Sequence, residues 1–127
     1  MPRVLVIDDN DTFKVAIGRL LQRHGFSVES LSSPIGAQAR LLEREDPIDV
    51  VVLDCVMPAL PGPALLAMLA KNERTAAVPV VLTSGLHDPA HAEAARRHPN
   101  ARFVSKTEPM AIVAAVREMY DASLQHH

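Results

Sequence analysis

The chain contains one cysteine, Cys55, among its 127 residues, which excludes an internal disulfide. A chain without disulfides is typical of a reducing compartment, so we expect a cytoplasmic protein. No apolar run approaches the ~20 residues that a membrane-spanning helix needs. The apolar stretch near the N-terminus is stopped by Asp8, which argues against a signal peptide. These absences predict a protein with no membrane segment.

Aromatic residues and positive charge are also scarce. Aromatics make up 3% of the chain and hydrophobic residues 48%, so the core must be built from aliphatic side chains. The net charge is −2, and bases are mixed with acids along the chain. A nucleic-acid-binding surface usually shows as a basic stripe, so we expect no direct contact with nucleic acid.

What the chain does contain is a regular alternation of two apolar patterns. Short, continuous runs rich in β-branched residues are typical of strands buried on both faces of a parallel sheet. Longer segments with apolar residues at helical spacing predict helices between these runs. The expected strands are residues 4–7, 27–31, 50–53, 78–82 and 102–104.

Each expected strand is followed by a helical pattern. The first helix carries Phe13, Ile17 and Leu21 on one stripe, and Gly25 follows where a helix C-terminus favours glycine. Serine, threonine and aspartate are good N-caps, and proline suits the first helical position. The later helices are therefore expected to begin at Ser33-Pro34, Pro63, Asp88-Pro89 and Thr107.

Five β-α units predict an α/β fold, a doubly wound, five-stranded parallel sheet with helices on both faces. A strand order of 2-1-3-4-5 would make the first and third strands neighbours at the point where ligands bind in such sheets. The length suits one domain, which we place at residues 1–124. Residues 125–127 are expected to be a frayed tail or the remnant of a tag.

Polar side chains gather at the expected carboxyl ends of the strands. They are Asp8 and Asp9 after the first strand, Asp54 after the third, Thr83 and Ser84 after the fourth, and Ser105 and Lys106 after the fifth. Three carboxylates can share a crevice when a cation neutralises them, and oxygen ligands favour Mg²⁺. A lysine nearby suits a phosphate, and a carboxylate beside a metal ion can attack phosphorus. The pattern indicates phosphoryl transfer to an aspartate.

The segments VLVIDDN, VVLDCVMPALPG, PVVLTSG and FVSK resemble the receiver domain of two-component response regulators. The resemblance implies the flavodoxin-like (βα)₅ fold and a phosphoacceptor role for Asp54. It implies that Mg²⁺ is held by Asp8, Asp9, Asp54 and the backbone carbonyl of Val56. It also implies that Lys106 contacts the phosphoryl group.

The resemblance further implies a switch made of a hydroxyl and an aromatic ring. Ser84 lies 30 residues after Asp54 and 22 before Lys106, which is the family's usual register. We therefore choose Ser84 over Thr83, whose side chain should point toward the opposite side of the strand. Phe103 matches the aromatic position, where the ring turns inward as the hydroxyl moves toward the phosphoryl group.

Two departures from the family pattern bear on the site. Regulators usually carry a proline in a cis peptide after this lysine, but here Thr107 follows Lys106. We expect either a trans bond with a remodelled loop or a strained cis bond. Val56 and Leu86 flank the site where many members have polar residues, so nothing there would position a hydrolytic water. This predicts a long-lived phosphoryl group.

The partners implied by the resemblance are a sensor histidine kinase or a histidine phosphotransfer protein, and an output partner or domain that the sequence does not identify. The chain would be a phosphoacceptor that promotes its own phosphorylation and dephosphorylation, not a conventional enzyme. A homodimer could form through the helix from Asp88, the strand 102–104 and the helix from Thr107, a face that is common in the family. The alternative is a receiver-like module that binds proteins independently of phosphorylation, and only Thr107 favours it.

Three other residues could carry metal or redox chemistry. His87 and His91 are four apart, a spacing that can bind zinc on a helix, but no third ligand is evident. Cys55 follows Asp54 and should face the other way, as a small core residue. We expect none of the three to form a separate site.

Overall fold

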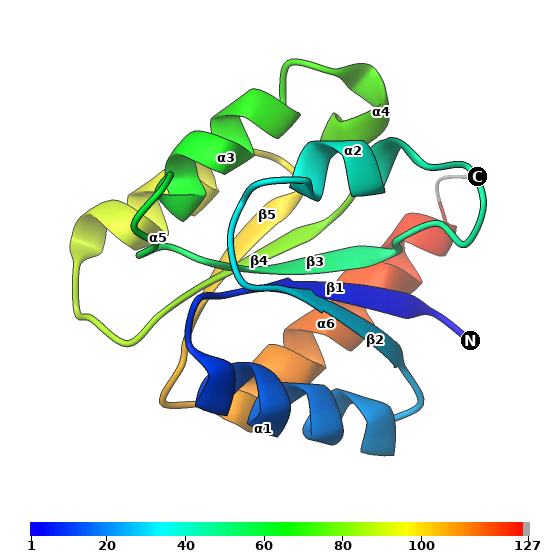
Figure 1. The fold of residues 1–127 in the computed structure, drawn as a ribbon, viewed down its shortest axis with the longest axis horizontal. Helices are drawn as coiled ribbons and strands as arrows, with labels where there is room; N and C mark the ends of the chain where they lie inside the picture. The colour runs from blue at the N-terminus through cyan, green and yellow to red at the C-terminus, as the bar shows by residue number, and fades with distance from the viewer. Residues whose placement is uncertain (126–127) are drawn as a thin grey trace.

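The computed structural model describes residues 1–125, which form a five-stranded parallel sheet with the order β2-β1-β3-β4-β5 (Figure 1). The predicted fold class and strand order are confirmed. The strands are β1 (Arg3–Ile7), β2 (Ser27–Leu31), β3 (Val50–Asp54), β4 (Val80–Ser84) and β5 (Ala101–Ser105). The fourth strand was predicted two residues too early, because the apolar run begins in the preceding loop.

Helices cover both faces of this sheet, with α1 and α6 on one side and α2, α3 and α5 on the other (Figure 1). The helices are α1 (Asp11–Arg23), α2 (Ala37–Leu42), α3 (Gly62–Leu69), α4 (Glu73–Ala76), α5 (Pro89–Arg96) and α6 (Pro109–Leu124). The sequence pattern missed α4, which is a single turn and too short to show a periodic apolar stripe.

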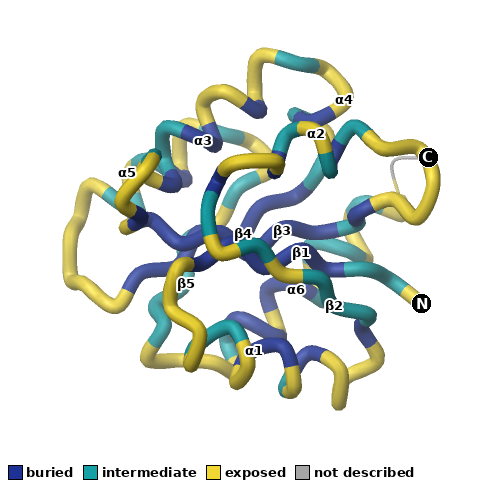
Figure 2. Tube along the Cα trace, viewed as in Figure 1, coloured by how far each residue is buried: buried dark blue, intermediate teal, exposed yellow. Residues whose placement is uncertain are grey.

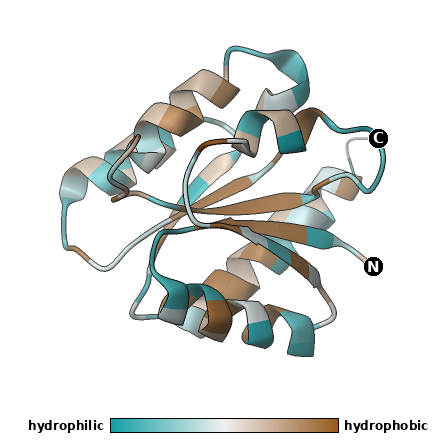
Figure 3. Cartoon of the chain, viewed as in Figure 1, coloured by the Kyte–Doolittle hydropathy of each residue, from teal (hydrophilic) through white to brown (hydrophobic). Residues whose placement is uncertain are grey.

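The core consists of two aliphatic layers, one on each face of the sheet. The layer under α1 and α6 contains Ile17, Leu21 and Ile112, whereas the layer under α2 and α3 contains Leu41 and Leu65. All residues of β3 and β4 are buried, and the ribbon is apolar along the central strands (Figures 2 and 3). This burial on both faces explains why their sequences are continuous apolar runs.

Two of the predicted helix starts are wrong. The hydroxyl of Ser33 accepts a hydrogen bond from the backbone N–H of Ile35, so it closes a local turn, and α2 begins three residues later after Gly36. Gly36 has a φ of 87°, a conformation that favours glycine. The hydroxyl of Thr107 contacts that of Ser105, and the N-cap of α6 is the following residue, Glu108.

The predicted positions of Asp88 and Gly25 at helix ends are confirmed, whereas α3 begins at Gly62, one residue before the predicted start at Pro63. The side chain of Asp88 accepts a hydrogen bond from the backbone N–H of Ala90 and caps α5. Gly25 follows α1 with a φ of 91°, as expected of a glycine beyond a helix end. None of the helices in residues 1–125 combines the length and the hydropathy of a membrane span. Of the predicted tail, Gln125 caps α6, and residues 126–127 lie outside the described residues.

Candidate functional site

Three carboxylates meet at the carboxyl edge of the sheet. Strands β1 and β3 pair in parallel from Val4 opposite Val50 to Ile7 opposite Leu53. This register brings together Asp8, Asp9 and Asp54, and one oxygen from each lies within 4.8 Å of the others. Asp8 and Asp54 are buried, whereas Asp9 is exposed. The sequence predicted this cluster, because neighbouring parallel strands end at the same edge.

Backbone donors next to each acid orient the two buried carboxylates. The N–H of Asn10 donates to Oδ1 of Asp8 at 2.9 Å, and the N–H of Val56 donates to Oδ1 of Asp54 at 3.3 Å. The Asn10 side chain in turn accepts a hydrogen bond from the N–H of Phe13 and caps α1. The first turn of α1 is thereby anchored to the acid cluster.

Gly62 allows the loop after β3 to return against the backbone of Asp54. Its N–H donates to the carbonyl of Cys55 at 3.1 Å. A Cβ at this position would lie 2.2 Å from the carbonyl oxygen of Asp54, which is far inside van der Waals contact. The close approach therefore requires glycine. Sequence reasoning placed a helix start at Pro63 but did not identify this contact.

Lys106, directly after β5, reaches across the sheet edge to both buried acids. Its Nζ lies 2.7 Å from Oδ2 of Asp8 and 3.4 Å from Oδ1 of Asp54. The same ammonium lies 4.6 Å from the centroid of the Phe13 ring. Sequence reasoning predicted the lysine near the acids but placed Phe13 only on the apolar stripe of its helix.

Burial and the neighbouring acid disfavour a negative charge on Asp54. Burial, and then the neighbouring carboxylate of Asp8, raise the pKa of Asp54 to about 6. The N–H of Val56 and the ammonium of Lys106 oppose this rise in pKa but do not cancel it. Asp54 is therefore ionised at neutral pH, at a cost to the folded protein.

The donor set fits a hard divalent cation. Oδ2 of Asp8 is buried and accepts no well-aligned hydrogen bond within residues 1–125, although the Lys106 ammonium is close to it. The three carboxylates carry more negative charge than one lysine neutralises. Oxygen ligands from carboxylates, with an exposed side open to water, are the ligands that Mg²⁺ prefers.

The two hydroxyls at the end of β4 have different surroundings. The hydroxyl of Ser84 accepts a hydrogen bond from the N–H of Leu86 at 3.0 Å, and its own O–H can still donate to a ligand. The hydroxyl of Thr83 lies 3.4 Å from the carbonyl of Leu53, at the long end of hydrogen bonding. Both residues are buried. The choice of Ser84 as the site hydroxyl stays a prediction.

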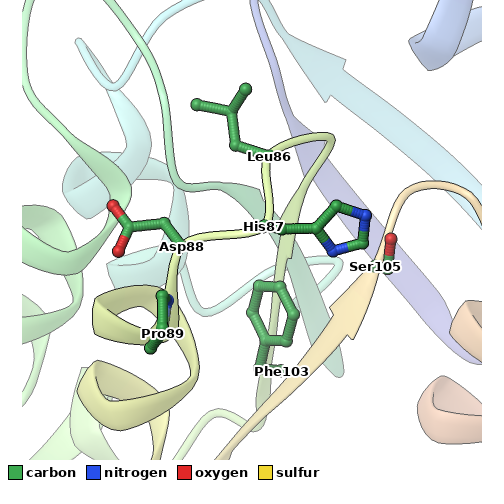
Figure 4. Close-up of a pocket in the computed structure, with 6 residues that line it drawn as sticks. All are labelled: Leu86, His87, Asp88, Pro89, Phe103 and Ser105. Carbon is green, nitrogen blue, oxygen red and sulfur yellow. The ribbon is translucent and has the colours of Figure 1, made fainter.

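Phe103 lines a cavity of about 250 Å³ between β5 and the loop before α5. Figure 4 shows the imidazole of His87 directed toward Ser105, next to the ring of Phe103. Leu86 and the carboxylate of Asp88 point away from this ring (Figure 4). The ring therefore has space beside it, as a switch residue needs, but its movement stays a prediction.

The loop after Lys106 keeps trans peptide bonds, and residues 1–125 contain no cis bond. The hydroxyl of Ser105 contacts that of Thr107 at 2.8 Å and accepts a hydrogen bond from the N–H of Thr107 at 3.2 Å. The N–H of Glu108 donates to the carbonyl of Ser105. The trans bond is one of the two expectations, and Lys106 still reaches the acids, while a loop remodelled relative to the family stays a prediction.

The other candidate residues form no second metal cluster within residues 1–125. Cys55 packs in the core under α3, and burial raises the pKa of its thiol to about 12, as expected of an inert core residue. The imidazole of His91 lies 3.7 Å from the carboxylate of Asp88.

Comparisons with known proteins agree with this geometry. Protein PilH from Pseudomonas aeruginosa is 34% identical over 84 residues, which cover 66% of this chain and 68% of that protein. Sensor kinase CckA from Brucella abortus is 30% identical over 122 residues, 93% of this chain but 12% of that protein. A solved receiver domain protein from Clostridium thermocellum superimposes with a TM-score of 0.87 and 26% identity over all of both chains.

The family model that matches is described as the response regulator receiver domain, and it covers residues 4–117. The match includes both acid-bearing strands and the segment that carries Lys106. The chain belongs to the response regulator receiver domain family of two-component signalling.

Proposed function

We propose that the chain receives a phosphoryl group on Asp54 from a phosphohistidine of a sensor histidine kinase or a histidine phosphotransfer protein. The observation that carries this proposal is the contact of one ammonium with two buried carboxylates at the edge of the sheet. Lys106 lies 2.7 Å from Asp8 and 3.4 Å from Asp54, beside an acid cluster that fits a divalent cation.

The nucleophile in this proposal is the carboxylate of Asp54. The N–H of Val56 and the ammonium of Lys106 both contact Oδ1, which leaves Oδ2 for the attack. One bond forms between this oxygen and phosphorus, while the bond from phosphorus to the donor's imidazole nitrogen breaks. A Mg²⁺ held by Asp8, Asp9, Asp54 and the carbonyl of Val56 would supply positive charge that stabilises the negative phosphoryl oxygens during transfer.

The ammonium of Lys106 provides the second positive charge beside the phosphoryl oxygens. It is a point charge on a flexible side chain, so it can move from Oδ1 of Asp54 to contact the phosphoryl oxygens. The O–H of Ser84 can donate to a phosphoryl oxygen while its oxygen still accepts from Leu86. Such a bond would pull on the loop before α5, next to Phe103. This would be the signal passed to an output partner.

The phosphoryl group is expected to be long-lived. Val56 and Leu86 flank the site with half or more of their surfaces exposed, at 50% and 60%. Neither side chain can hydrogen-bond a water for attack on the phosphorus. Hydrolysis would then depend on water held by the metal site and the backbone alone.

Two further expectations on partners remain. The alternative function, a binding module that works without phosphorylation, depended on Thr107, and the observation against it is that Lys106 still contacts both acids.

For the homodimer, Arg102 and Glu118 on the expected face already pair within one chain at 2.6 Å. Dimerisation therefore stays a prediction, to be tested by sedimentation with and without the phosphoryl group.

The test of the proposed function is intact mass after incubation with Mg²⁺ and a small-molecule phosphodonor. We expect one added phosphoryl group on the wild-type chain, and none on Asp54→Asn or in the presence of EDTA. An adduct that persists in Asp54→Asn would place the phosphoacceptor elsewhere. A wild-type chain without an adduct under any donor would favour the binding module.

A further inference from the structure

The ammonium of Lys106 has an aromatic ring as a third neighbour besides the two carboxylates. The ring belongs to Phe13 in the first turn of α1, and its centroid lies 4.6 Å from Nζ. The face of a phenyl ring attracts a cation within about 6 Å of its centroid. The lysine side chain is only 17% exposed, and this attraction grows as water is removed from the ammonium.

The ring stands on a segment that is fixed to the acid cluster. The N–H of Phe13 donates to the Asn10 side chain, and the N–H of Asn10 donates to Asp8. The ring and the carboxylate that contact Lys106 therefore come from one short stretch, residues 8–13. A lysine has a long stem that loses much rotamer freedom when it is held in one place. Two anchors on one hydrogen-bonded stretch reduce the positions that the ammonium can take.

We propose that Phe13 is a positioning residue, whose ring holds the ammonium of Lys106 where it meets the phosphoryl group on Asp54. This inference rests on the proposed function. The carboxylates that now contact the lysine are also the groups that fit a divalent cation. The ring offers an attraction that uses no carboxylate oxygen, so it can hold Lys106 when Asp8 serves as a metal ligand.

A purely structural role for Phe13 is the competing explanation. The ring also packs against the core layer under α1, and with Leu20, Arg23 and Pro109 it lines a groove of about 390 Å³. Loss of the ring could therefore lower stability without any effect on the lysine. The test needs a readout that reports on Lys106 itself and a control on the same groove.

The first readout is the proton NMR shift of the Lys106 ε-methylene group in the metal-free protein, identified by its loss in Lys106→Met. A ring next to the ammonium moves these protons upfield. We expect the upfield shift to disappear in Phe13→Leu, which keeps an apolar side chain, and to remain in Phe13→Tyr, which keeps the ring. Leu20→Ala removes apolar contact from the same groove and should leave the shift unchanged.

The second readout is the rate of phosphorylation by phosphoramidate at saturating Mg²⁺. We expect Phe13→Leu to lower this rate about three- to tenfold, the range expected for loss of one cation–π contact in the transition state. Phe13→Tyr should restore the rate. Leu20→Ala should stay close to wild type.

The outcomes separate this inference from the proposed function. An unshifted Lys106 ε-methylene in the wild type, or an unchanged rate in Phe13→Leu, would overturn the positioning role. An equal loss of rate in Leu20→Ala would show that packing is the cause, and would also overturn it. A wild-type chain that accepts no phosphoryl group would refute the proposed function, and the positioning role with it, while the NMR shift would still establish whether the contact exists.

Discussion

Neutralising Asp54 should stabilise the metal-free protein, although it removes the proposed phosphoacceptor. The pKa of this carboxyl is raised from 3.8 to about 6, first by burial and then by Asp8. At ~1.4 kcal/mol for each pKa unit, this difference corresponds to roughly 3 kcal/mol of folding free energy. Asp54→Asn keeps an oxygen that can accept from Val56 and removes the charge that the carboxylate of Asp8 opposes. We expect a gain of ~1–3 kcal/mol near neutral pH.

The sign of the pH dependence follows from proton binding. Between about pH 4 and pH 6 the folded chain binds the Asp54 proton more tightly than the unfolded chain. Raising the pH through this window therefore destabilises the wild type relative to Asp54→Asn. The advantage of the variant should be full above about pH 6 and should vanish near pH 4.

The assay is urea unfolding followed by far-ultraviolet circular dichroism, because the chain has no tryptophan. Both chains are measured in EDTA at about pH 7.5 and pH 4, with Asp121→Asn as an exposed-acid control that should show no such difference. Mg²⁺ should stabilise the wild type more than the variant, because in the proposed function it would bind the folded acid cluster. Equal stability of wild type and Asp54→Asn in EDTA at both pH values would refute the reasoning.

Three further predictions concern the loop after β3, the phosphoryl lifetime and the ion pair between α2 and β2. Gly62→Ala should destabilise the fold by ~2–3 kcal/mol in urea unfolding, because its Cβ would collide with the backbone of Asp54. The control is Gly18→Ala, whose Cβ would make only an ordinary contact at 3.6 Å and should not cause this loss of stability. Equal losses in the two variants would show that the collision is not the cause. Val56→Gln should shorten the phosphoryl lifetime followed by intact mass, because an amide can hold a water, and an unchanged lifetime would remove Val56 from the explanation. Arg40→Gln should cost ~0.5–1 kcal/mol at about pH 7, because Arg40 makes two hydrogen bonds to Glu29 and lowers its pKa from 4.5. The pKa of Glu29 is lowered in the folded chain, so that loss should be full above the ordinary pKa of 4.5 and should shrink as the pH falls through the lowered pKa. A loss independent of pH would argue against the ion pair.

The strand order predicts some contacts of the site but not others. Asp8, Asp54 and Lys106 follow or end parallel strands, so their meeting at one edge was predictable once the order was known. The contact of Phe13 with Lys106 was not predictable, because it depends on how α1 packs against the sheet. A side chain on an apolar stripe can serve the core, a neighbouring charge, or both, and the spacing is the same.

Alternative local hydrogen bonds also limited the prediction of helix starts from the sequence. Ser33 and Thr107 were each predicted to cap a helix. In the structure, each hydroxyl instead bonds a group two residues away in a turn. Asp88 does cap its helix. Three residues that favour N-caps thus gave one confirmed cap and two wrong predictions, because such a side chain can bond either a helix N–H or a nearer group in a turn.

The sequence by itself determined the fold class, the strand order and the acids that meet at the edge of the sheet. Continuous apolar runs can only be stable when both faces are covered, and charges that follow such runs must lie at the sheet edge. Tertiary structure alone decided that Gly62 abuts the backbone of Asp54, that the pKa of Asp54 is raised, and that Phe13 faces Lys106. These properties depend on distances between segments far apart in the chain and on the removal of water, and no local pattern of residues encodes either one.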